Sequence, residues 1–377
     1  MALGSVRVRP GFMWSCTGLL SSQLKLVMAE SHFSERGLRL LSIDGGGIRG
    51  LSPLFILRNL MWRIRMANDL DYTPRPCEYF DLIGGTNTGG LIALMLGCLS
   101  MSVEEAIACW EQFSVKGFDD TKGFGIHDGK YKASSFEDIL KSIVKDHTES
   151  HNPEVEMMEE SAAACKAFVC AMNADNMNAL IPVLFRTYYH PKEAPRDCKI
   201  WEAGRATCAM PVLFKRIEIG SQYMKQSYID GGVGCNNPAK MVLKEARDVF
   251  PAREIVCLLS IGTGYPKTIA IRAAARSHLS NSVDDVGKAL MDIATDCEET
   301  AQDLAKKYCD IPDVYFRLNV QRGMEQIMPE QWDHLSQVEA HTDQYLKDAN
   351  IDPIVEKIVK ILVEGGPNFD ISTRSSQ

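Results

Sequence analysis

The sequence predicts a three-layer α/β/α fold, in which helices cover both faces of a mainly parallel central sheet. Short continuous apolar runs, which are typical of strands buried on both faces, alternate with longer segments whose apolar residues recur at helical spacing. Clusters of glycine follow three of the apolar runs, where a strand would turn into a helix. This alternation is the pattern of a parallel sheet with helices on both sides.

Each predicted strand is a short run rich in apolar residues, and the clearest of them stop at glycine or a small polar residue. The first run, Leu38–Ile43, reads LRLLSI and stops at Asp44 before three glycines. In chain order, the predicted strands are Leu38–Ile43, Tyr79–Ile83, Lys166–Met172, Val183–Tyr188, Gln226–Ile229 and Ile255–Ile261. Because helical segments separate most of them, we expect most of these strands to run parallel.

The predicted helices carry apolar residues at intervals of three and four, which places those residues on one helix face. In chain order, these helices are Leu51–Met66, Gly89–Leu99, Ile200–Ala209, Pro238–Val249, Val283–Lys307 and Met328–Lys347. Two capping boxes predict further helices after Ser102 and Ser134, because a glutamate stands three residues after each serine.

Residues 1–36 differ from the rest of the chain. No acidic residue precedes Glu30, whereas Arg7, Arg9 and Lys25 lie among small and apolar residues. We interpret this segment as a poorly ordered N-terminal extension, with a transit peptide as the alternative. No linker rich in proline, glycine or serine divides residues 37–377, so they are predicted to form a single domain.

The composition argues against several classes of protein. Hydrophobic residues make up 45% of the 377 residues and charged residues 24%, which is typical of globular proteins. A net charge of −8 gives no overall attraction for nucleic acid. No apolar run reaches the roughly 18 residues of a membrane-spanning helix. The 12 cysteines form no CxxC pair, so we predict a cytoplasmic protein without a metal site.

The first glycine cluster, Gly45–Gly50, lies between a strand and a helix and fits the pattern GxGxxG. This pattern can bind a dinucleotide when an acidic residue follows about 20 positions later at the end of a strand. Asp69 and Asp71 have that spacing, but they follow the predicted helix and not a strand. The same loop can instead direct backbone N–H groups at a developing oxyanion. The loop alone leaves both uses open.

The second cluster has the framing of a nucleophile elbow, G-x-S-x-G, with Gly85 and Gly89 around residue 87. Small residues are needed there because the strand and helix backbones crowd at a sharp turn. The middle residue is Asn87, whose amide has no nucleophilic oxygen. Thr86 and Thr88 flank it, and the elbow is expected to turn their side chains away from the site.

The third cluster follows the predicted strand Gln226–Ile229. The strand ends at Asp230, which is followed by a glycine-rich turn and then by Asn237 and Pro238 as the N-cap and first residue of a helix. An aspartate at a strand end beside an elbow is a candidate general base. The sequence therefore predicts that Asp230 and residue 87 lie within hydrogen-bonding distance.

Together the three clusters resemble the patatin-like phospholipase family, most closely its fungal members. The resemblance covers about Gly37 to Leu346 and rests on the segments LRLLSIDGGGIRG, YFDLIGGTNTGG, KIWEAGRATCAMPVLF, YIDGGVGCNNP, LLSIGTG and QVEAHTDQYL. It implies a three-layer α/β/α fold and the hydrolysis of acyl esters in lipids by a Ser–Asp dyad, with neither metal nor cofactor. A lipid or acyl-ester substrate and a peripheral membrane contact are implied as well.

The resemblance also implies a role for each cluster. Asn87 falls on the nucleophile position, where the family has serine, and Asp230 falls on the proton acceptor. The oxyanion hole falls on Gly45, Gly46 and Gly47. The elbow and its supporting residues fall on Arg49, Gly50, Gly85, Gly89, Gly231 and Gly232.

Because Asn87 cannot attack an ester, we expect a lipid acyl hydrolase of the phospholipase A or esterase type that is impaired or inactive. A lipid-binding pseudoenzyme or a signalling module on the same fold is one alternative. A nucleotide-binding protein that uses Gly45–Gly50 is another.

Overall fold

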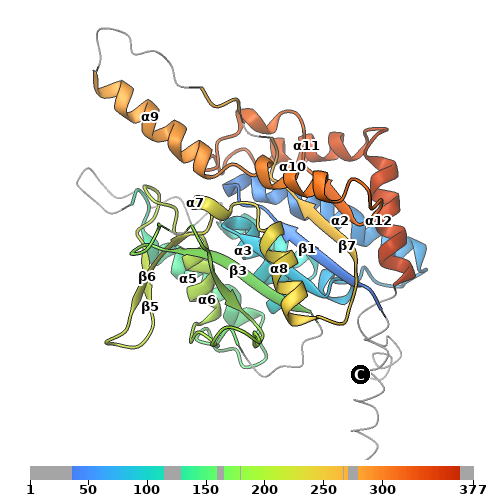
Figure 1. The fold of residues 1–377 in the computed structure, drawn as a ribbon, viewed down its shortest axis with the longest axis horizontal. Helices are drawn as coiled ribbons and strands as arrows, with labels where there is room; N and C mark the ends of the chain where they lie inside the picture. Colours follow the sequence, from blue (N-terminus) through green and yellow to red (C-terminus); the bar gives the residue numbers. More distant parts are fainter. Residues whose placement is uncertain are drawn as a thin grey trace, which may run out of the picture.

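The computed structural model describes residues 36–113, 129–158, 165–178, 180–265, 267–270 and 279–365. Apart from Arg36, the predicted N-terminal extension lies outside these ranges. The strands are β1 Leu38–Ile43, β2 Leu82–Thr86, β3 Lys166–Asn173, β4 Val183–Arg186, β5 Ile217–Ile219, β6 Gln226–Asp230, β7 Ile255–Ile261 and β8 Tyr315–Leu318. They form one sheet in the order β5-β6-β3-β2-β1-β7-β8, and β4 also pairs with β3 (Figure 1).

Helices and helical turns connect these strands. The α-helices are α2 Leu51–Ala67, α3 Thr88–Ala93, α4 Val103–Gln112, α5 Ala133–Asp146, α6 Ile200–Thr207, α7 Gly232–Cys235, α8 Ala239–Val249, α9 Leu279–Ala294, α10 Glu298–Lys307, α11 Leu335–Leu346 and α12 Asp352–Glu364. A π-helical turn, Leu94–Cys98, extends α3. Short 3-10 turns span Gly47–Gly50, Pro76–Glu78 and Met324–Gln326.

The sheet is mainly parallel. Strands β3, β2, β1, β7 and β8 run parallel, each to its neighbour. Strands β4 and β6 lie antiparallel to β3, and β5 lies antiparallel to β6. The parallel part agrees with the sequence prediction. Helical connections between these strands carry the chain back to the end of the sheet at which each strand begins.

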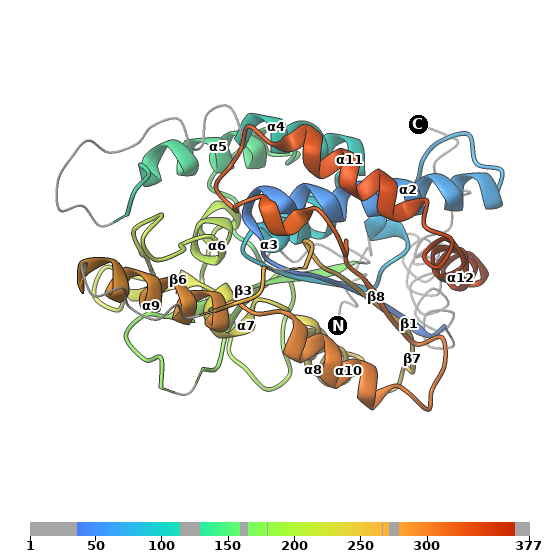
Figure 2. The ribbon, with the colours of Figure 1, turned by 90° about the horizontal axis from the view of Figure 1, so that it is seen from above.

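Helices cover both faces of the sheet, as β1 shows. Leu38 and Leu40 pack with residues of α8, whereas Leu41 and Ile43 point the other way and pack with residues of α2. Seen from above, α8 and α10 lie on one side of the sheet and α2, α4 and α11 on the other (Figure 2). Strand β1 is buried along its whole length, so its apolar run follows from two covered faces. The predicted three-layer α/β/α architecture is therefore confirmed.

Several predicted elements are confirmed with small shifts in their bounds. The predicted bounds of β1 and β7 are those of the structure, and the Ser102–Glu105 capping box closes the first turn of α4. Strand β2 begins at Leu82 and not at Tyr79, because Tyr79 still closes a 3-10 turn. Helix α8 begins at Ala239, one residue after the predicted start.

Other predictions were wrong in their extent. The long helix Val283–Lys307 is two helices, because Asn236 and Asn237 donate side-chain hydrogen bonds to the carbonyls of Thr295 and Cys297 at the break. Helix α5 begins at Ala133, so Ser134 lies inside its first turn and makes no capping box. The helix predicted from Met328 begins only at Leu335. Strands β5 and β8 and helix α12 are present in the structure but were not predicted from the sequence.

Candidate active site

The strand register brings the three glycine clusters to one edge of the sheet. Ile43 of β1 lies opposite Gly85 of β2, so Asp44 and Thr86 follow at the same level. Thr86 lies opposite Cys170 of β3, and the next residue of β3 lies opposite Asp230 of β6. The ends of β1, β2 and β6 therefore meet, and the residues that follow them share a site.

Asn87 occupies a tight elbow between β2 and α3. Its backbone has a φ of 54° and a ψ of −128°, which is rare for a residue other than glycine. A Cβ on Gly85 would lie 2.1 Å from the carbonyl oxygen of Gly89, and a Cβ on Gly89 would lie 2.3 Å from that of Ile43. The Asn87 N–H donates to Thr207 Oγ1 at 2.9 Å. The flanking glycines and Thr207 thus fix the direction of the residue-87 side chain.

The Asn87 and Asp230 side chains are in direct contact. Asn87 Nδ2 donates a hydrogen bond to Asp230 Oδ2, and Asn87 Oδ1 accepts one from the N–H of Thr88 at 2.6 Å. The other oxygen of Asp230 accepts from the N–H of Gly232 at 2.6 Å. Burial raises the pKa of Asp230 to about 7, although the hydrogen bonds from Gly232 and Asn87 favour the ionised form. The predicted proximity of residues 87 and 230 is present in the structure.

The amides of the glycine loop after β1 differ in their hydrogen bonding. The N–H of Gly45 donates to the carbonyl of Asn236 at 3.1 Å, so this amide is not free to act in an oxyanion hole. Within the described residues, no acceptor pairs with the N–H of Gly46 or Gly47, and both residues line the cavity beside Asn87. Gly47 has a φ of 59°, and a Cβ on it would lie 2.1 Å from the carbonyl oxygen of Pro329.

The remaining glycines that the sequence singles out support this arrangement. A Cβ on Gly231 would lie 2.4 Å from the carbonyl oxygen of Cys170, and one on Gly50 would lie 2.8 Å from the Trp110 ring. Arg49 lines the cavity, and burial lowers the pKa of its guanidinium. These residues therefore hold the loop and the elbow close together, and only Arg49 brings a charge to the cavity from this set.

A cavity of about 250 Å³ lies in front of Asn87 and the glycine loop. Its apolar lining consists of Leu91, Phe136, Met210, Leu213, Phe214, Ile269, Ile327, Met328 and Trp332. Its polar lining includes Arg49, Lys267, Lys288, Asp292 and Glu325. A cavity with mostly apolar walls and a few polar groups suits a ligand with an acyl chain.

The comparisons with known proteins agree with this geometry. Residues 41–243, which hold the glycine loop, the elbow and Asp230, match the family model described as patatin-like phospholipase. The chain belongs to the patatin-like phospholipase family. The match ends inside α8, so the segments that supply α9, α10 and β8 lie beyond it.

Curated relatives of the family are similar over three quarters of the chain. Phospholipase A I of Arabidopsis thaliana is 27% identical over 348 residues, which cover 76% of this chain and 25% of the relative. The human calcium-independent phospholipase A2-gamma is 29% identical over 301 residues, which cover 75% of this chain and 35% of the relative. The chain thus spans about a quarter to a third of the length of these relatives.

Among solved structures, the crystal structure of VipD from Legionella pneumophila is similar to this chain. The similarity covers 82% of this chain and 67% of VipD, with 13% identity and a TM-score of 0.43.

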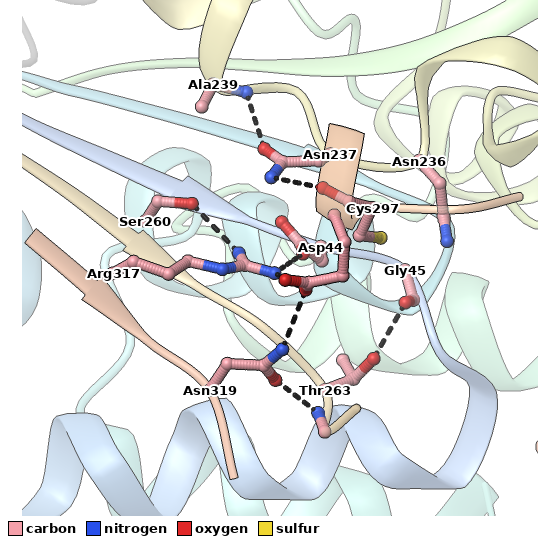
Figure 3. A network of polar contacts seen from close by, with 12 residues as sticks. Asp44, Gly45, Asn236, Asn237, Ala239, Ser260, Thr263, Cys297, Arg317 and Asn319 are labelled. Atoms are coloured by element: carbon pink, nitrogen blue, oxygen red, sulfur yellow. Dashed lines mark hydrogen bonds and ion pairs between the residues drawn. The ribbon is translucent and has the colours of Figure 1, made fainter. Parts of the chain in front are cut away.

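A buried polar network lies behind the glycine loop, mostly on segments beyond the matched stretch (Figure 3). Arg317 of β8 contacts Asp44 at 2.7 Å and donates to Ser260 at 3.0 Å and to Glu298 at 3.1 Å. Burial alone would lower the pKa of Arg317, but Asp44 and Glu298 outweigh it and raise that pKa. The network ties the end of β1 to β7, β8 and α10.

Two side chains near the elbow behave differently from each other. Thr86 Oγ1 donates to the carbonyl of Cys235 at 2.8 Å, away from the cavity, as the sequence predicts. Thr88 instead lines the cavity, and its buried hydroxyl makes no hydrogen bond within the described part of the chain. The Thr88 hydroxyl lies beside the glycine loop, since a Cβ on Gly50 would be 2.9 Å from Thr88 Oγ1.

Much of the cavity wall comes from residues that sequence patterns do not mark. Trp332, Phe136 and the residues of α9 line the cavity, yet no local motif marks them. Asn236, which also lines it, lay inside a motif that the sequence analysis read only for its helix cap. In the described ranges, no three His, Cys, Asp or Glu residues gather as metal ligands, and no helix has the length and apolar character to span a bilayer.

Proposed function

We propose that this chain has the site of a lipid acyl hydrolase of the phospholipase A or esterase type, with residue 87 at the nucleophile position. The observation that carries the proposal is the hydrogen bond between the side chains of Asn87 and Asp230, beside a largely apolar cavity and the Gly46 and Gly47 amides, which have no acceptor among the described residues. Membership of the family and the names of the relatives, which are phospholipases, support a lipid ester as the substrate.

With serine at position 87, the geometry would support a two-step reaction. Asp230, which burial brings to a pKa of about 7, would accept the proton of the hydroxyl as its oxygen forms a bond to the ester carbonyl carbon. The N–H groups of Gly46 and Gly47 would donate to the oxyanion, where each such donor is worth about 10²–10³ in rate. The alcohol would leave with the proton, and water would then hydrolyse the acyl-enzyme.

Asparagine at position 87 prevents the first step of this reaction. Its Nδ2 donates to Asp230 and its Oδ1 accepts from Thr88. The amide is therefore hydrogen-bonded to the proposed base and supplies no attacking oxygen. We therefore propose that the chain is impaired or inactive as a hydrolase while its cavity remains able to bind lipid. A lipid-binding pseudoenzyme is the second candidate, and the intact apolar walls favour it.

The nucleotide-binding alternative finds less support in the geometry. A Cβ on Gly45 would lie 2.2 Å from Asn236 Oδ1 and 2.8 Å from the Cβ of Asn87, so this glycine serves the contact with the elbow. Asp69 and Asp71 follow α2, and neither lies at the end of a strand. The loop therefore lacks the acidic partner of a dinucleotide site.

We also propose a peripheral contact with a lipid surface through α9. Val286, Leu290 and Ile293 recur at helical spacing and are 39%, 58% and 55% exposed. Lys288 and Asp292 of the same helix line the cavity. A lipid surface that covers the apolar stripe would thus contact a helix that also lines the cavity. The cytoplasmic location expected from the cysteine pattern stays a prediction.

Covalent labelling tests the proposed chemistry. The Asn87→Ser variant should react with a fluorophosphonate at residue 87, which mass spectrometry of the labelled peptide would locate. Asn87→Ser combined with Asp230→Asn should label much more slowly, because the hydroxyl loses its proton acceptor. Labelling that is equally fast in both variants would contradict the role of Asp230.

A further inference from the structure

Asn236 lies where the three parts of the proposed site come together. It follows α7, six residues after Asp230, and its half-buried side chain lines the cavity. In Figure 3 its side chain extends on the side of Gly45, whereas that of Asn237 reaches Ala239 and Cys297. The two neighbouring asparagines therefore have the same chemistry but different surroundings.

The first contact of Asn236 is with the glycine loop. Its carbonyl accepts the N–H of Gly45 at 3.1 Å. Its side-chain Oδ1 lies so close that a Cβ on Gly45 would be 2.2 Å from it. Gly45 in turn packs on Asn87, because the same Cβ would lie 2.8 Å from the Asn87 Cβ. The carboxamide of Asn236 thus packs against the loop next to Gly46 and Gly47, which line the cavity.

The second contact is with the turn that holds Asp230. A Cβ on Gly232 would lie 3.0 Å from Asn236 Oδ1 and 3.0 Å from Asp230 Oδ1. The N–H of Gly232 is the backbone donor to Asp230. A shift of the Asn236 side chain would therefore displace Gly232, whose N–H fixes the orientation of the Asp230 carboxylate.

The third contact is with the cavity wall. Asn236 Nδ2 donates to the carbonyl of Thr295 at 2.7 Å, at the break between α9 and α10. Thr295 and residues of α9 line the cavity. A single carboxamide therefore lies between the glycine loop, the Asp230 turn and the wall.

We propose that Asn236 is a positioning residue, which sets the separation of the glycine loop and the Asp230 turn and links both to α9. The proposal rests on the proposed function, since the separation matters only if these groups act on one reacting carbonyl. Removal of the carboxamide leaves the backbone bond to Gly45 but opens the space that the side chain fills. Displacement of catalytic groups by about 1 Å can cost on the order of 10² in rate.

Asn237 supplies a matched control. Its Nδ2 donates to the carbonyl of Cys297 at 3.2 Å, and its Oδ1 accepts from the N–H of Ala239 at 3.1 Å. It thus makes a similar bond to the same α9–α10 junction, while its described hydrogen bonds reach neither the glycine loop nor the Asp230 turn. Asn236→Ala and Asn237→Ala should therefore both lower the melting temperature, and only the first should act on the reaction.

The kinetic test compares the two alanine variants in the Asn87→Ser protein on a short-chain acyl ester. Asn236→Ala should lower kcat by about 10–100-fold and leave KM within about threefold, since the proposed effect is on orientation during the reaction. Asn237→Ala should leave kcat within about threefold. Equal losses of kcat in the two variants, or a change confined to KM, would overturn the proposal.

Hydrogen exchange in the unmodified Asn87 protein tests the same proposal without any activity. Asn236→Ala should speed exchange of the peptides that contain the hydrogen-bonded amides of Gly45 and Gly232 by about tenfold, because the side chain that packs against both residues is lost. Asn237→Ala should leave those peptides unchanged and affect only the start of α10. If Asn87→Ser proves inert but the exchange pattern is as expected, the proposed function fails and the positioning contacts stand. Unchanged exchange in Asn236→Ala would overturn the positioning role itself.

Discussion

The stretch that matches the family, residues 41–243, and the segments that follow it build two different parts of the site. The matched stretch holds the elbow, Asp230 and the glycine loop, each of which lies in a short glycine-rich motif. The later segments supply α9, β8 and Arg317, which reach the site only through tertiary packing. The comparison shows that the groups proposed for the chemistry are marked by local motifs, whereas the groups that hold them in place are not.

The first way to test this comparison is to disturb the glycine loop itself. In the Asn87→Ser protein, Gly47→Ala should lower kcat by about 10²–10³, the range for the loss of one oxyanion donor. An alanine at a φ of 59°, with its Cβ 2.1 Å from the carbonyl oxygen of Pro329, must displace the loop. Steady-state kinetics on an acyl ester would measure the loss.

Gly287→Ala is the control for that substitution. Nothing lies within 4 Å of a Cβ at Gly287 on α9, so this variant should keep its activity and gain up to about 1 kcal/mol of stability from helix propensity. If the two glycine variants were equally active, the glycine loop would have no role in the reaction.

The second test concerns the support from the later segments. Arg317→Met should lower the free energy of unfolding by about 3–5 kcal/mol, because it leaves the buried Asp44 and the partly buried Glu298 without their counter-charge. Arg63→Met removes an ion pair at 2.6 Å with the partly exposed Asp352 and should cost less than about 1 kcal/mol. Urea unfolding of both variants would measure the difference, and similar losses would contradict the support that we assign to Arg317.

The third test uses pH. Burial raises the pKa of Asp230 to about 7, and only the carboxylate can accept a proton. Below that pH, kcat/KM of the Asn87→Ser protein should therefore fall by about tenfold per pH unit, and above it the rate should level off. An inflection near pH 4 would show that Asp230 is exposed to solvent in the working protein and is not held in a buried turn.

The smallest expected effect concerns the α9 stripe. Leu290→Ser should weaken binding to phosphatidylcholine vesicles by about fivefold, since a partly exposed leucine contributes roughly 1 kcal/mol when it enters an apolar phase. Met66→Ser, at a residue of α2 that is 60% exposed compared with 58% for Leu290, should leave binding unchanged. Vesicle sedimentation would measure both, and equal effects would remove α9 as the contact surface.

The sequence was informative wherever a local rule determines the structure. The alternation of apolar runs predicted the layers, and the bounds of β1 and β7 were those of the structure because both strands lie deep in the sheet. The G-x-N-x-G framing and the strand end at Asp230 predicted the contact between residues 87 and 230. These patterns reflect steric limits on a few neighbouring residues.

The rest depends on partners that are distant in the chain. Gly45 was predicted as an oxyanion donor, but Asn236 takes up its N–H from about 190 positions away. The break between α9 and α10 follows from side chains of Asn236 and Asn237, which helix periodicity does not reveal. Trp332 packs in the hydrophobic core and also lines the cavity, from a segment that carries no local motif. Single-sequence patterns carry no signal for such contacts.

The central claim is that the site lacks only an attacking oxygen, and the turnover of a short acyl ester by Asn87→Ser tests it most directly. Serine is smaller than asparagine and should fit the elbow without overpacking. We predict a gain of at least about 10³-fold over the parent, within the roughly 10⁶-fold that loss of the nucleophile costs a serine protease. Asp230→Asn in the same protein should abolish the gain. A folded Asn87→Ser protein that stays at the parent rate would contradict the claim and favour a lipid-binding pseudoenzyme.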